Sequence, residues 1–406
     1  MFPIIAIIGF IEKNVGLKTS LAGGSMIIRC TKKLMDELVL KPTLQKEESP
    51  LFSWHSNVIT IDRKKAVVMV NDSSRYAVVL FGLKKRDFQN LGKLVLSAIK
   101  DAFSEECIDD AVAAHYISNA GEVLFAKAED RSSLARVNKA AGFVDAYYDY
   151  VLADSIIQSP LSVRISRILV GAGKGSKEYK YPNEELYADL EELCKKPALK
   201  CRAAVMKVKL DLESFDVWRR ITVPLNYTFE MLHKTLQAAF GWKDYHLHEF
   251  YLYREKAPVD IEYVNHPGFH KDGYKPLMNI VCDEEAFAYP SDVPMRMENE
   301  VRLSDYFDIG CKSAKYVYDL GDDWQHYIEI EEVIDDFRSN YPVCLEGRGD
   351  TPPEDVGGES GYEQFVRAMA DENDPEHDEY VLWSKGMGYE GFDIEKVNRR
   401  LKLIFG

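Results

Sequence analysis

Runs of β-branched residues in the first half of the chain predict a small sheet. From Asn57 onward, the segments VITID, AVVMVN and RYAVVLFG are separated by the short polar stretches RKK and DSS. Strand-forming runs bounded by turn residues predict three strands in an antiparallel meander. The next stretch predicts a helix that covers this sheet, because its apolar residues fall on one helical face. These residues are Phe88, Leu91, Leu94, Val95, Ala98, Ile99 and Phe103.

A second group of patterns begins near residue 203. β-Branched and aromatic residues predict strands at 203–213, 216–224, 246–254, 315–320 and 324–334. A helix is predicted between the second and third of these strands, capped by Thr228 and ended by Gly241. Helical patterns then close the chain. Strands first and helices afterwards predict an α+β fold rather than an alternating α/β fold.

The chain length predicts two domains, because 406 residues exceed the roughly 100 to 200 residues of a usual domain. The Gly- and Lys-rich stretch LVGAGKGSKEYKYP separates the two groups of patterns. Met26 opens a well-patterned segment, so a start codon placed too far upstream would explain the residues before it. The predicted parts are an extension at 1–25, an α+β domain at 26–170, a linker region at 171–200 and an α+β domain at 201–406. Each domain is predicted to be a mainly antiparallel sheet covered by helices.

The net charge of −15 is shared unevenly between the two halves. Residues 1–200 hold 28 Lys and Arg against 25 Asp and Glu, whereas residues 201–406 hold 23 against 41. An acidic surface repels phosphate backbones and anionic lipid headgroups. Nucleic-acid binding is therefore expected only through the first domain.

Cysteine usage and hydropathy predict a cytoplasmic protein without membrane contact. The seven cysteines include no C-x-x-C pair, which favours reduced thiols over disulfides or a zinc ribbon. The most apolar stretch, Phe2 to Ile11, is about half the ~20 residues that a membrane-spanning helix needs. No basic segment precedes it, so it does not have the pattern of a signal peptide.

Three motifs of the second half carry a family resemblance: VWRRITVP with FGWKDYHLHEF, then YDLGDDWQHYIEIE, then CLEGRGDTPPEDVGGESGYEQF. Together they resemble the plasmid pRiA4b ORF-3-like family over about residues 203–400. Through MIIRCTKKLMDEL, PLFSWHSNVITIDRKK and NDSSRYAVVL, residues 26–170 resemble a small bacterial domain of unknown function. The resemblance implies a protein associated with plasmids or other mobile elements, and it implies no particular reaction.

The same motifs contain side chains that suit a divalent cation. Two histidines alternate along the predicted strand 246–254, so their imidazoles are expected on one face. Carboxylates follow Gly321 at a predicted turn and lie in a Pro-Pro-Glu-Asp loop. If these loops converge, they would hold Zn²⁺ or Mn²⁺ and activate water for hydrolysis. The candidate residues are His246, His248, Asp322, Asp323, His326, Glu354 and Asp355.

A purely structural role for these residues is the alternative. Asp322 and Asp323 would cap the turn by accepting backbone N–H groups, and a carboxylate of the Pro-Pro-Glu-Asp loop would pair with Arg219 or Arg220. The many aromatic residues nearby would fill the core. They would otherwise line a ligand groove, for which the candidates are Trp242, Tyr245 and Trp324.

Two groups of three cations are predicted to share one end of the first sheet. In an up-down-up meander, the turn after the first strand and the exit from the third strand lie at the same end. Such a patch would position phosphates of a polyanion without reading sequence. The residues are Arg63, Lys64 and Lys65 at the turn, and Lys84, Lys85 and Arg86 at the exit.

These observations leave three functions open. A non-catalytic interaction or adaptor protein with a basic protein partner is favoured, because no complete set of nucleophile, base and orienting group is visible. The alternatives are a divalent-metal-dependent hydrolase that uses the second domain, and a polyanion-binding accessory factor that uses the basic edge of the first.

Overall fold

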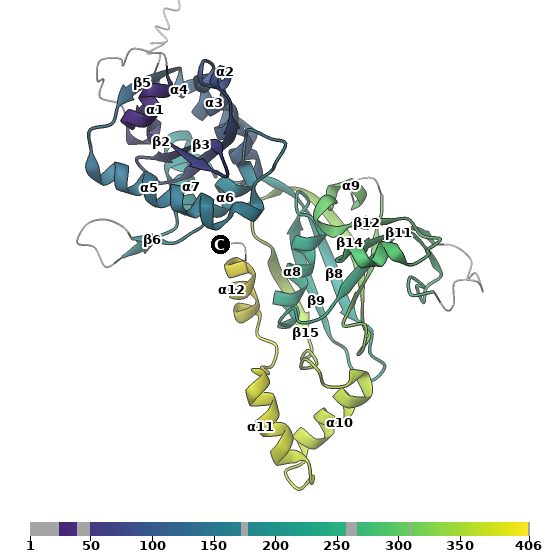
Figure 1. Ribbon diagram of the computed structural model, residues 1–406. Helices are drawn as coiled ribbons and strands as arrows, with labels where there is room; N and C mark the ends of the chain where they lie inside the picture. The colour runs from purple at the N-terminus through teal and green to yellow at the C-terminus, as the bar shows by residue number, and fades with distance from the viewer. Residues whose placement is uncertain (1–23, 39–48, 172–177, 257–265, 308–309, 405–406) are drawn as a thin grey trace, which may run out of the picture.

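The computed structural model describes residues 24–38, 49–171, 178–256, 266–307 and 310–404. These residues form two α+β regions, each built on its own sheet (Figure 1). The predicted fold class is confirmed. The predicted extension 1–25 lies outside the described residues except for Gly24 and Ser25. Within the part of the chain that the structure describes, no helix is long and apolar enough to cross a bilayer.

The N-terminal sheet has five strands in the order β4-β3-β2-β1-β5. The predicted meander is confirmed as β2 (Ser53–Ile61), β3 (Lys64–Asn71) and β4 (Ala77–Leu83), which pair antiparallel. Next to it, β1 (Ser25–Cys30) pairs in parallel with β2, and β5 (Glu122–Lys127) pairs in parallel with β1. This sheet is therefore mixed rather than purely antiparallel.

Helices cover both faces of the N-terminal sheet. They are α1 (Lys32–Glu37), α2 (Lys85–Phe88), α3 (Leu91–Glu105), α4 (Asp110–Ala120), α5 (Arg131–Ala146), α6 (Ser159–Ser166) and α7 (Pro182–Cys194). One face, with Met69 and Leu80, packs against α3, α4 and α7, and the other face, with Val68 and Val79, packs against α5 and α6. Burial on both faces explains why β3 and β4 are continuous apolar runs.

The segment 171–200, predicted as a linker, belongs largely to the N-terminal region. Leu186, Tyr187 and Leu190 on α7 are buried in the core that α3 and α4 also form. Before α7, the two-residue strands β6 (Val170–Gly171) and β7 (Tyr179–Lys180) pair with each other. The linker prediction is therefore corrected: the apolar stripe on α7 is buried, and β8 begins at Cys201.

The C-terminal sheet has eight strands in the order β12-β11-β10-β13-β14-β8-β9-β15. All neighbours pair antiparallel except β11 and β12, which are parallel. The strands are β8 (Cys201–Leu210), β9 (Trp218–Pro224), β10 (His248–Lys256), β11 (Tyr274–Val281), β12 (Met295–Met297), β13 (Ser313–Tyr318), β14 (Trp324–Phe337) and β15 (Val343–Arg348).

The helix α8 (Phe229–Phe240) packs on this sheet as the sequence predicts. The Thr228 hydroxyl accepts the backbone N–H of Met231, and Gly241 ends the helix with φ 86°. The other helices are α9 (Ser304–Phe307), α10 (Gly358–Ala370), α11 (His377–Met387) and α12 (Ile394–Ile404). Figure 1 shows α12 beside α8, whereas α10 and α11 form an arm that projects away from the N-terminal region.

The two regions meet at a buried carboxylate. Glu106, at the end of α3, is fully buried. Its Oε2 accepts hydrogen bonds from Arg167 Nη2 at 2.6 Å, the Tyr187 hydroxyl at 2.6 Å and Asn340 Nδ2 at 2.8 Å. Asn340 follows β14 in the C-terminal region, so this side chain links the two sheets through one acceptor.

Candidate functional site

Three loops meet at one end of the C-terminal sheet. The β10, β13 and β14 strands are paired so that the start of β10, the end of β13 and the start of β14 are adjacent. The loop between α8 and β10 contributes His246, the turn after β13 contributes Asp319, and the loop after β15 contributes Glu354 and Asp355. Antiparallel pairing thus gathers residues from distant parts of the sequence.

The imidazole of His246 faces carboxylates from two of these loops. Its Nε2 atom lies 3.1 Å from Asp355 Oδ1, 3.5 Å from Asp319 Oδ2 and 4.0 Å from Glu354 Oε2. Among the described residues, this buried nitrogen has no hydrogen bond of good geometry. One ligand atom each from His246, Asp319 and Asp355 lies within 4.8 Å of the others. The arrangement offers one nitrogen and two oxygen ligands to a cation.

Glu354 is the buried carboxylate of this cluster. Its Oε1 accepts the backbone N–H of Lys243 at 2.6 Å and the Tyr318 hydroxyl at 3.1 Å. Burial raises the pKa of Glu354 above the usual range, and these two hydrogen bonds oppose the rise. A carboxylate held in this way can exchange a proton nearer neutral pH than an exposed glutamate.

Each of the three loops holds an aspartate in the left-handed backbone region. The φ angles are 60° for Asp244, 56° for Asp319 and 58° for Asp355. Glycine adopts this region without a steric cost, and Asp tolerates it better than most residues. The side chain of Asp355 is 57% exposed, and its carboxylate contacts His246. Packing therefore does not explain a carboxylate at this position.

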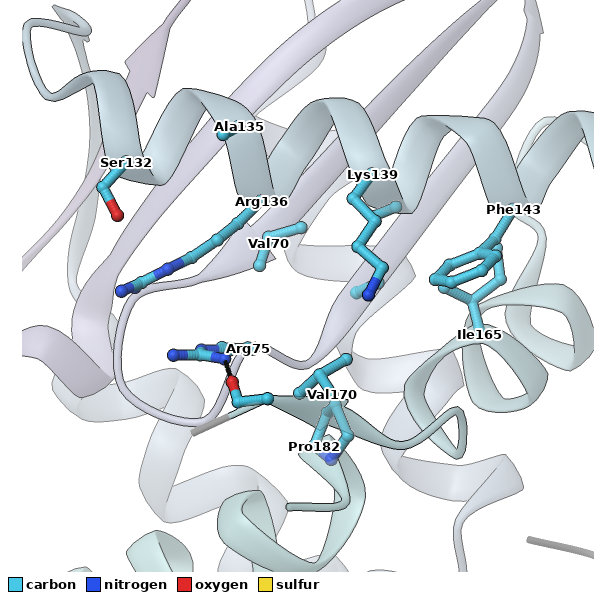
Figure 2. Close-up of a pocket in the computed structure, with 13 residues that line it drawn as sticks. Val70, Arg75, Ser132, Ala135, Arg136, Lys139, Phe143, Ile165, Val170 and Pro182 are labelled. Atoms are coloured by element: carbon cyan, nitrogen blue, oxygen red, sulfur yellow. Dashed lines mark hydrogen bonds between the residues drawn. The ribbon is translucent and has the colours of Figure 1, made fainter. Parts of the chain in front are cut away.

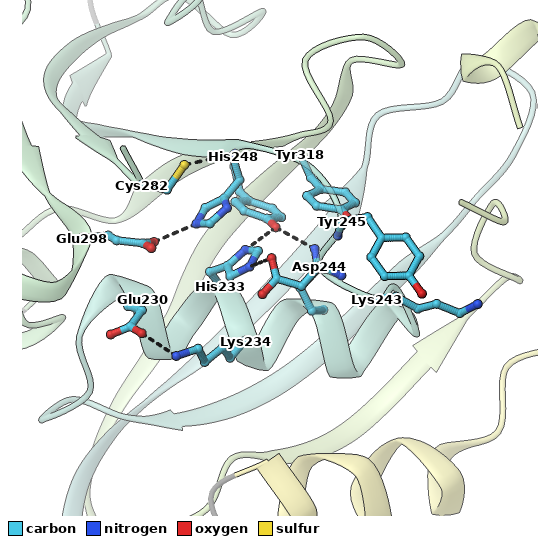
Figure 3. A network of polar contacts seen from close by, with 12 residues as sticks. Glu230, His233, Lys234, Lys243, Asp244, Tyr245, His248, Cys282, Glu298 and Tyr318 are labelled. Atoms are coloured by element: carbon cyan, nitrogen blue, oxygen red, sulfur yellow. Dashed lines mark hydrogen bonds and ion pairs between the residues drawn. The ribbon is translucent and has the colours of Figure 1, made fainter. Parts of the chain in front are cut away.

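A second imidazole cluster lies beneath these loops (Figure 3). The rings of His233 and His248 stack with centroids 3.4 Å apart and planes 1° from parallel. His233 Nε2 lies 2.8 Å from Asp244 Oδ1, and His248 Nε2 lies 2.7 Å from Glu298 Oε2. Each imidazole thus has its own carboxylate.

The two stacked rings differ in protonation. Burial lowers the pKa of His233, and the charge of His248 lowers it further, although Asp244 acts in the opposite direction. Burial disfavours a charge on His248 too, but contacts with Cys282 and Glu298 outweigh it and raise its pKa to about 9. One positive charge on His248, beside a neutral His233, avoids placing two cations face to face.

The structure separates the two histidines that the sequence places on one face. β10 begins at His248, so His246 lies in the preceding loop and the alternation of a strand does not extend to it. His246 joins Glu354 and Asp355, whereas His248 joins His233 and Glu298. The expectation of one shared face is wrong for this reason.

The remaining predicted ligands have other contacts. Asp322 Oδ2 accepts the N–H of Gly357 at 3.1 Å, which ties the turn after β13 to the Pro-Pro-Glu-Asp loop. Asp323 accepts a hydrogen bond from Gln325 Nε2 at 2.7 Å. His326 is fully buried between Phe240 and Trp242, and burial lowers its pKa to about 3. His326 therefore serves as a neutral core residue.

The proposed structural contacts of these motifs also need correction. Asp319, not Asp322 or Asp323, caps the turn, because its Oδ1 accepts the N–H groups of Gly321 and Asp322. Arg219 donates to the carbonyls of Arg348 and Gly349 and to the Thr351 hydroxyl.

Arg220 pairs with Glu331 and Glu346 across neighbouring strands. The carboxylates of the Pro-Pro-Glu-Asp loop therefore do not pair with either arginine of the VWRR motif.

The predicted aromatic groove does not form from its three candidates. Trp242 and Trp324 are buried in the C-terminal core, where Trp242 Nε1 donates to the Pro352 carbonyl at 2.9 Å. Tyr245 is 63% exposed. Both indoles pack in the core, and Trp242 also holds the Pro-Pro-Glu-Asp loop through this hydrogen bond. Of the three candidates, only Tyr245 lies at the surface.

Sequence reasoning missed four residues of these clusters, which are Asp319, His233, Asp244 and Glu298. The sequence pattern predicts Asp319 within the strand 315–320, although an aspartate two residues before Gly321 is a signal for an Asx turn. His233 lies inside α8 and Glu298 lies far along the chain, and no local pattern relates either of them to His248.

The basic edge of the N-terminal sheet has the expected geometry. Lys65 lies opposite Leu83 in the β3–β4 pair, so the turn at Arg63 and the exit at Lys84 are at the same end. Its charges are partly neutralised, because Lys65 Nζ lies 2.6 Å from Glu37 Oε1. Polyanion binding at this edge stays a prediction.

Comparisons with known proteins place the site loops within a known family. Residues 202–401 match the family described as plasmid pRiA4b ORF-3-like protein, and residues 27–185 match the Domain of unknown function (DUF6933). "Uncharacterized protein y4hQ" of Sinorhizobium fredii is 35% identical over 190 residues, which are 46% of this chain and 84% of that protein. The chain belongs to the plasmid pRiA4b ORF-3-like family.

The pRiA4b ORF-3-like region contains every residue of both imidazole clusters. A solved structure, "Crystal Structure of Protein of Unknown Function MM3350 from Methanosarcina mazei Go1", is 32% identical, with a TM-score of 0.38. That match covers 48% of this chain and 96% of the other. The family name associates these proteins with plasmids and assigns them no reaction.

Proposed function

We propose that the pRiA4b ORF-3-like region is a divalent-cation-dependent hydrolase. The observation that carries this proposal is the convergence of Asp319, Glu354 and Asp355 on the Nε2 atom of His246. A histidine with two aspartates would supply three protein ligands and leave positions open for water and substrate, as catalytic cation sites do. Imidazole and carboxylate ligands without a thiolate suit Zn²⁺ or Mn²⁺.

The residues around the proposed ligands can divide the work of hydrolysis. A cation held by His246, Asp319 and Asp355 would lower the pKa of a bound water molecule. Glu354 is next to these ligands, and its raised pKa suits a general base that accepts a proton from that water. The Tyr318 hydroxyl and the Lys243 N–H keep the Glu354 carboxylate in place.

Metal content and metal-induced stabilisation test the proposal directly. Purified full-length protein is stripped with EDTA, and its melting temperature is measured with and without Zn²⁺ or Mn²⁺. We expect the melting temperature to rise with one of these ions, since a ligand that binds only the folded state stabilises it by mass action. Asp355→Asn should abolish the rise. Asp323→Asn is the matched control, because Asp323 also has a left-handed backbone but binds Gln325 instead.

Turnover is the second test. Hydrolysis of p-nitrophenyl phosphate and p-nitrophenyl acetate is followed with the stabilising ion and with EDTA. We expect ion-dependent hydrolysis of one ester, and its loss in Glu354→Gln with ion-induced stabilisation retained. Wild-type protein that gains no stability from either ion, or the same response in Asp355→Asn as in wild type, would refute the cation site.

The projecting arm favours protein binding as a second candidate function. The segment between α10 and α11 is rich in Asp and Glu, and Leu382 on α11 is 75% exposed. An acidic surface with an exposed apolar residue suits a basic protein partner. Binding of a lysine-rich peptide, measured by fluorescence anisotropy, should weaken in Glu372→Gln/Asp378→Asn/Glu379→Gln. Unchanged binding in this triple variant would exclude the arm as the docking surface.

A further inference from the structure

The N-terminal region contains a cavity that is separate from the clusters described above. It has a volume of about 310 Å³ and lies between α5 and the β3–β4 pair. Val70 and Ala77 of the sheet line it, and Phe143, Ile165 and Val170 add further apolar walls. Figure 2 shows Arg136 and Lys139 reaching from α5 toward the segment that carries Arg75.

Three cations therefore surround one apolar cavity. Arg75 lies in the turn between β3 and β4, and Arg136 and Lys139 are on adjacent turns of α5. Arg136 and Lys139 have no carboxylate partner among the described residues, and Lys139 lies over the Phe143 ring. The lining of this cavity therefore combines three positively charged side chains with apolar walls.

Arg75 is held in position by its backbone and by the strand β6. Its φ of 66° is uncommon for a residue with a long side chain. The backbone N–H of Arg75 bonds to the Asn71 carbonyl, and its guanidinium donates to the carbonyl of Gly171. Burial, followed by the positive charge of Arg136, lowers the pKa of Arg75, and the negative charge of Glu185 acts in the opposite direction. Two guanidinium groups thus face the same space although they repel each other.

The backbone N–H groups at the N-terminus of α5 do not supply the anion site. The Asp130 carboxylate caps α5 by accepting the backbone N–H groups of Ser132 and Ser133. These N–H groups are therefore occupied. Any anion in the cavity would be recognised by the side chains of Arg75, Arg136 and Lys139.

We propose that this cavity binds a small organic phosphate, with the phosphate between Arg75, Arg136 and Lys139 and an apolar or aromatic body against Phe143 and Val170. Three cations match a phosphate dianion better than a carboxylate, and guanidinium groups bond phosphate oxygens in pairs. The volume is at the lower end of the range for small-molecule pockets. The ligand is therefore a small molecule, not a nucleic acid.

The probe is phenyl phosphate, which joins a phosphate dianion to an aromatic ring. Its binding to the full-length protein is measured by isothermal titration calorimetry, beside inorganic phosphate, benzoate and benzyl alcohol. We expect phenyl phosphate to bind more tightly than the other three, because it alone satisfies both the cations and the apolar wall.

Arg136→Ala and Lys139→Ala should each weaken binding of phenyl phosphate about tenfold or more, since a charge-assisted hydrogen bond contributes about that factor. Arg131→Ala is the matched control, because Arg131 is an exposed arginine on the same helix that does not line the cavity. Circular dichroism confirms that each variant is folded.

Three outcomes would overturn the proposal. One is an absence of phenyl phosphate binding. The second is an equal loss in Arg131→Ala and Arg136→Ala, which would mean diffuse attraction to a positive surface. The third is benzoate binding as tightly as phenyl phosphate, which would replace phosphate with a carboxylate ligand.

Discussion

Replacing Arg167 with methionine should destabilise the protein strongly, because Glu106 would keep a buried charge without its cation. Glu106 is fully buried, and Arg167 Nη2 lies 2.6 Å from its Oε2. The Arg167 side chain is itself 8% exposed. Neither charge can be solvated by water when the other is removed, so the pair differs from a surface ion pair, which contributes at most about 1 kcal/mol.

The magnitude follows from the contacts that remain. In Arg167→Met, the carboxylate of Glu106 still accepts hydrogen bonds from the hydroxyls of Tyr76 and Tyr187 and from Asn340 Nδ2. These neutral donors satisfy its oxygens but do not cancel its charge. Removing one partner of a buried ion pair costs about 3–5 kcal/mol. We expect a loss of about 3 kcal/mol in the free energy of unfolding, at the lower end because these donors remain.

A double variant separates charge from packing. In Glu106→Gln/Arg167→Met, the neutral amide can still accept hydrogen bonds from Tyr187 and Asn340, and no buried charge is left. We expect it to be more stable than Arg167→Met alone, with a coupling energy of about 2 kcal/mol.

Urea denaturation followed by circular dichroism measures the stability of the wild type, Arg167→Met, Glu106→Gln and the double variant. Hydrogen exchange shows whether α3 and α6 lose protection together. The reasoning fails if Arg167→Met costs less than about 1 kcal/mol, or if the double variant costs the sum of the two single ones.

Three further predictions concern the C-terminal region. The pKa of His326 is about 3 in the folded state and ordinary when unfolded, so the unfolded chain binds the extra proton and stability falls as pH drops below 6.5. The free energy of unfolding should fall by about 2 kcal/mol from pH 7 to pH 5, and this loss should be absent in His326→Phe. Urea denaturation at the two pH values measures it. The pKa of His248 is about 9, above its unfolded value, so its contribution to stability is complete below pH 6.5 and is lost as pH rises through 9. Glu298→Gln should reduce the change in the free energy of unfolding between pH 7 and pH 9. An unchanged slope would contradict the assignment. Asp355→Gly should leave the metal-free melting temperature the same or slightly higher, because glycine relieves the left-handed backbone, while the response to Zn²⁺ or Mn²⁺ disappears; a clear fall in the metal-free value would indicate a structural role.

The elements with strong periodicity were predictable from the sequence. The β2–β4 meander, the apolar stripe of α3 and the caps of α8 follow from local patterns, and all of them are present. The parallel addition of β1 and β5 was not predictable, because partner choice depends on the whole sheet. The burial of α7 was not predictable, because the Gly- and Lys-rich stretch before it has the pattern of a linker.

The candidate site was predictable in composition but not in grouping. His246, Glu354 and Asp355 do converge, since the loops that carry them lie at one end of an antiparallel sheet. The sequence predicts His248 in the same cluster, because His246 and His248 would share a face if both lay on one strand. The start of β10 at His248 changes that result, and strand ends are the least predictable feature of a sequence.

The left-handed aspartates connect the fold of these loops with their chemistry. A loop selected for stability alone would favour glycine where φ is near 60°, because glycine adopts that angle without steric cost. Asp244 and Asp319 offset the cost by bonding to His233 and to the backbone of their own turn. Among the described residues, the carboxylate of Asp355 makes no comparable contact with its own turn, and it faces His246 at an exposed rim. The residue with the weakest structural reason to be an aspartate is therefore the one best placed to bind a cation.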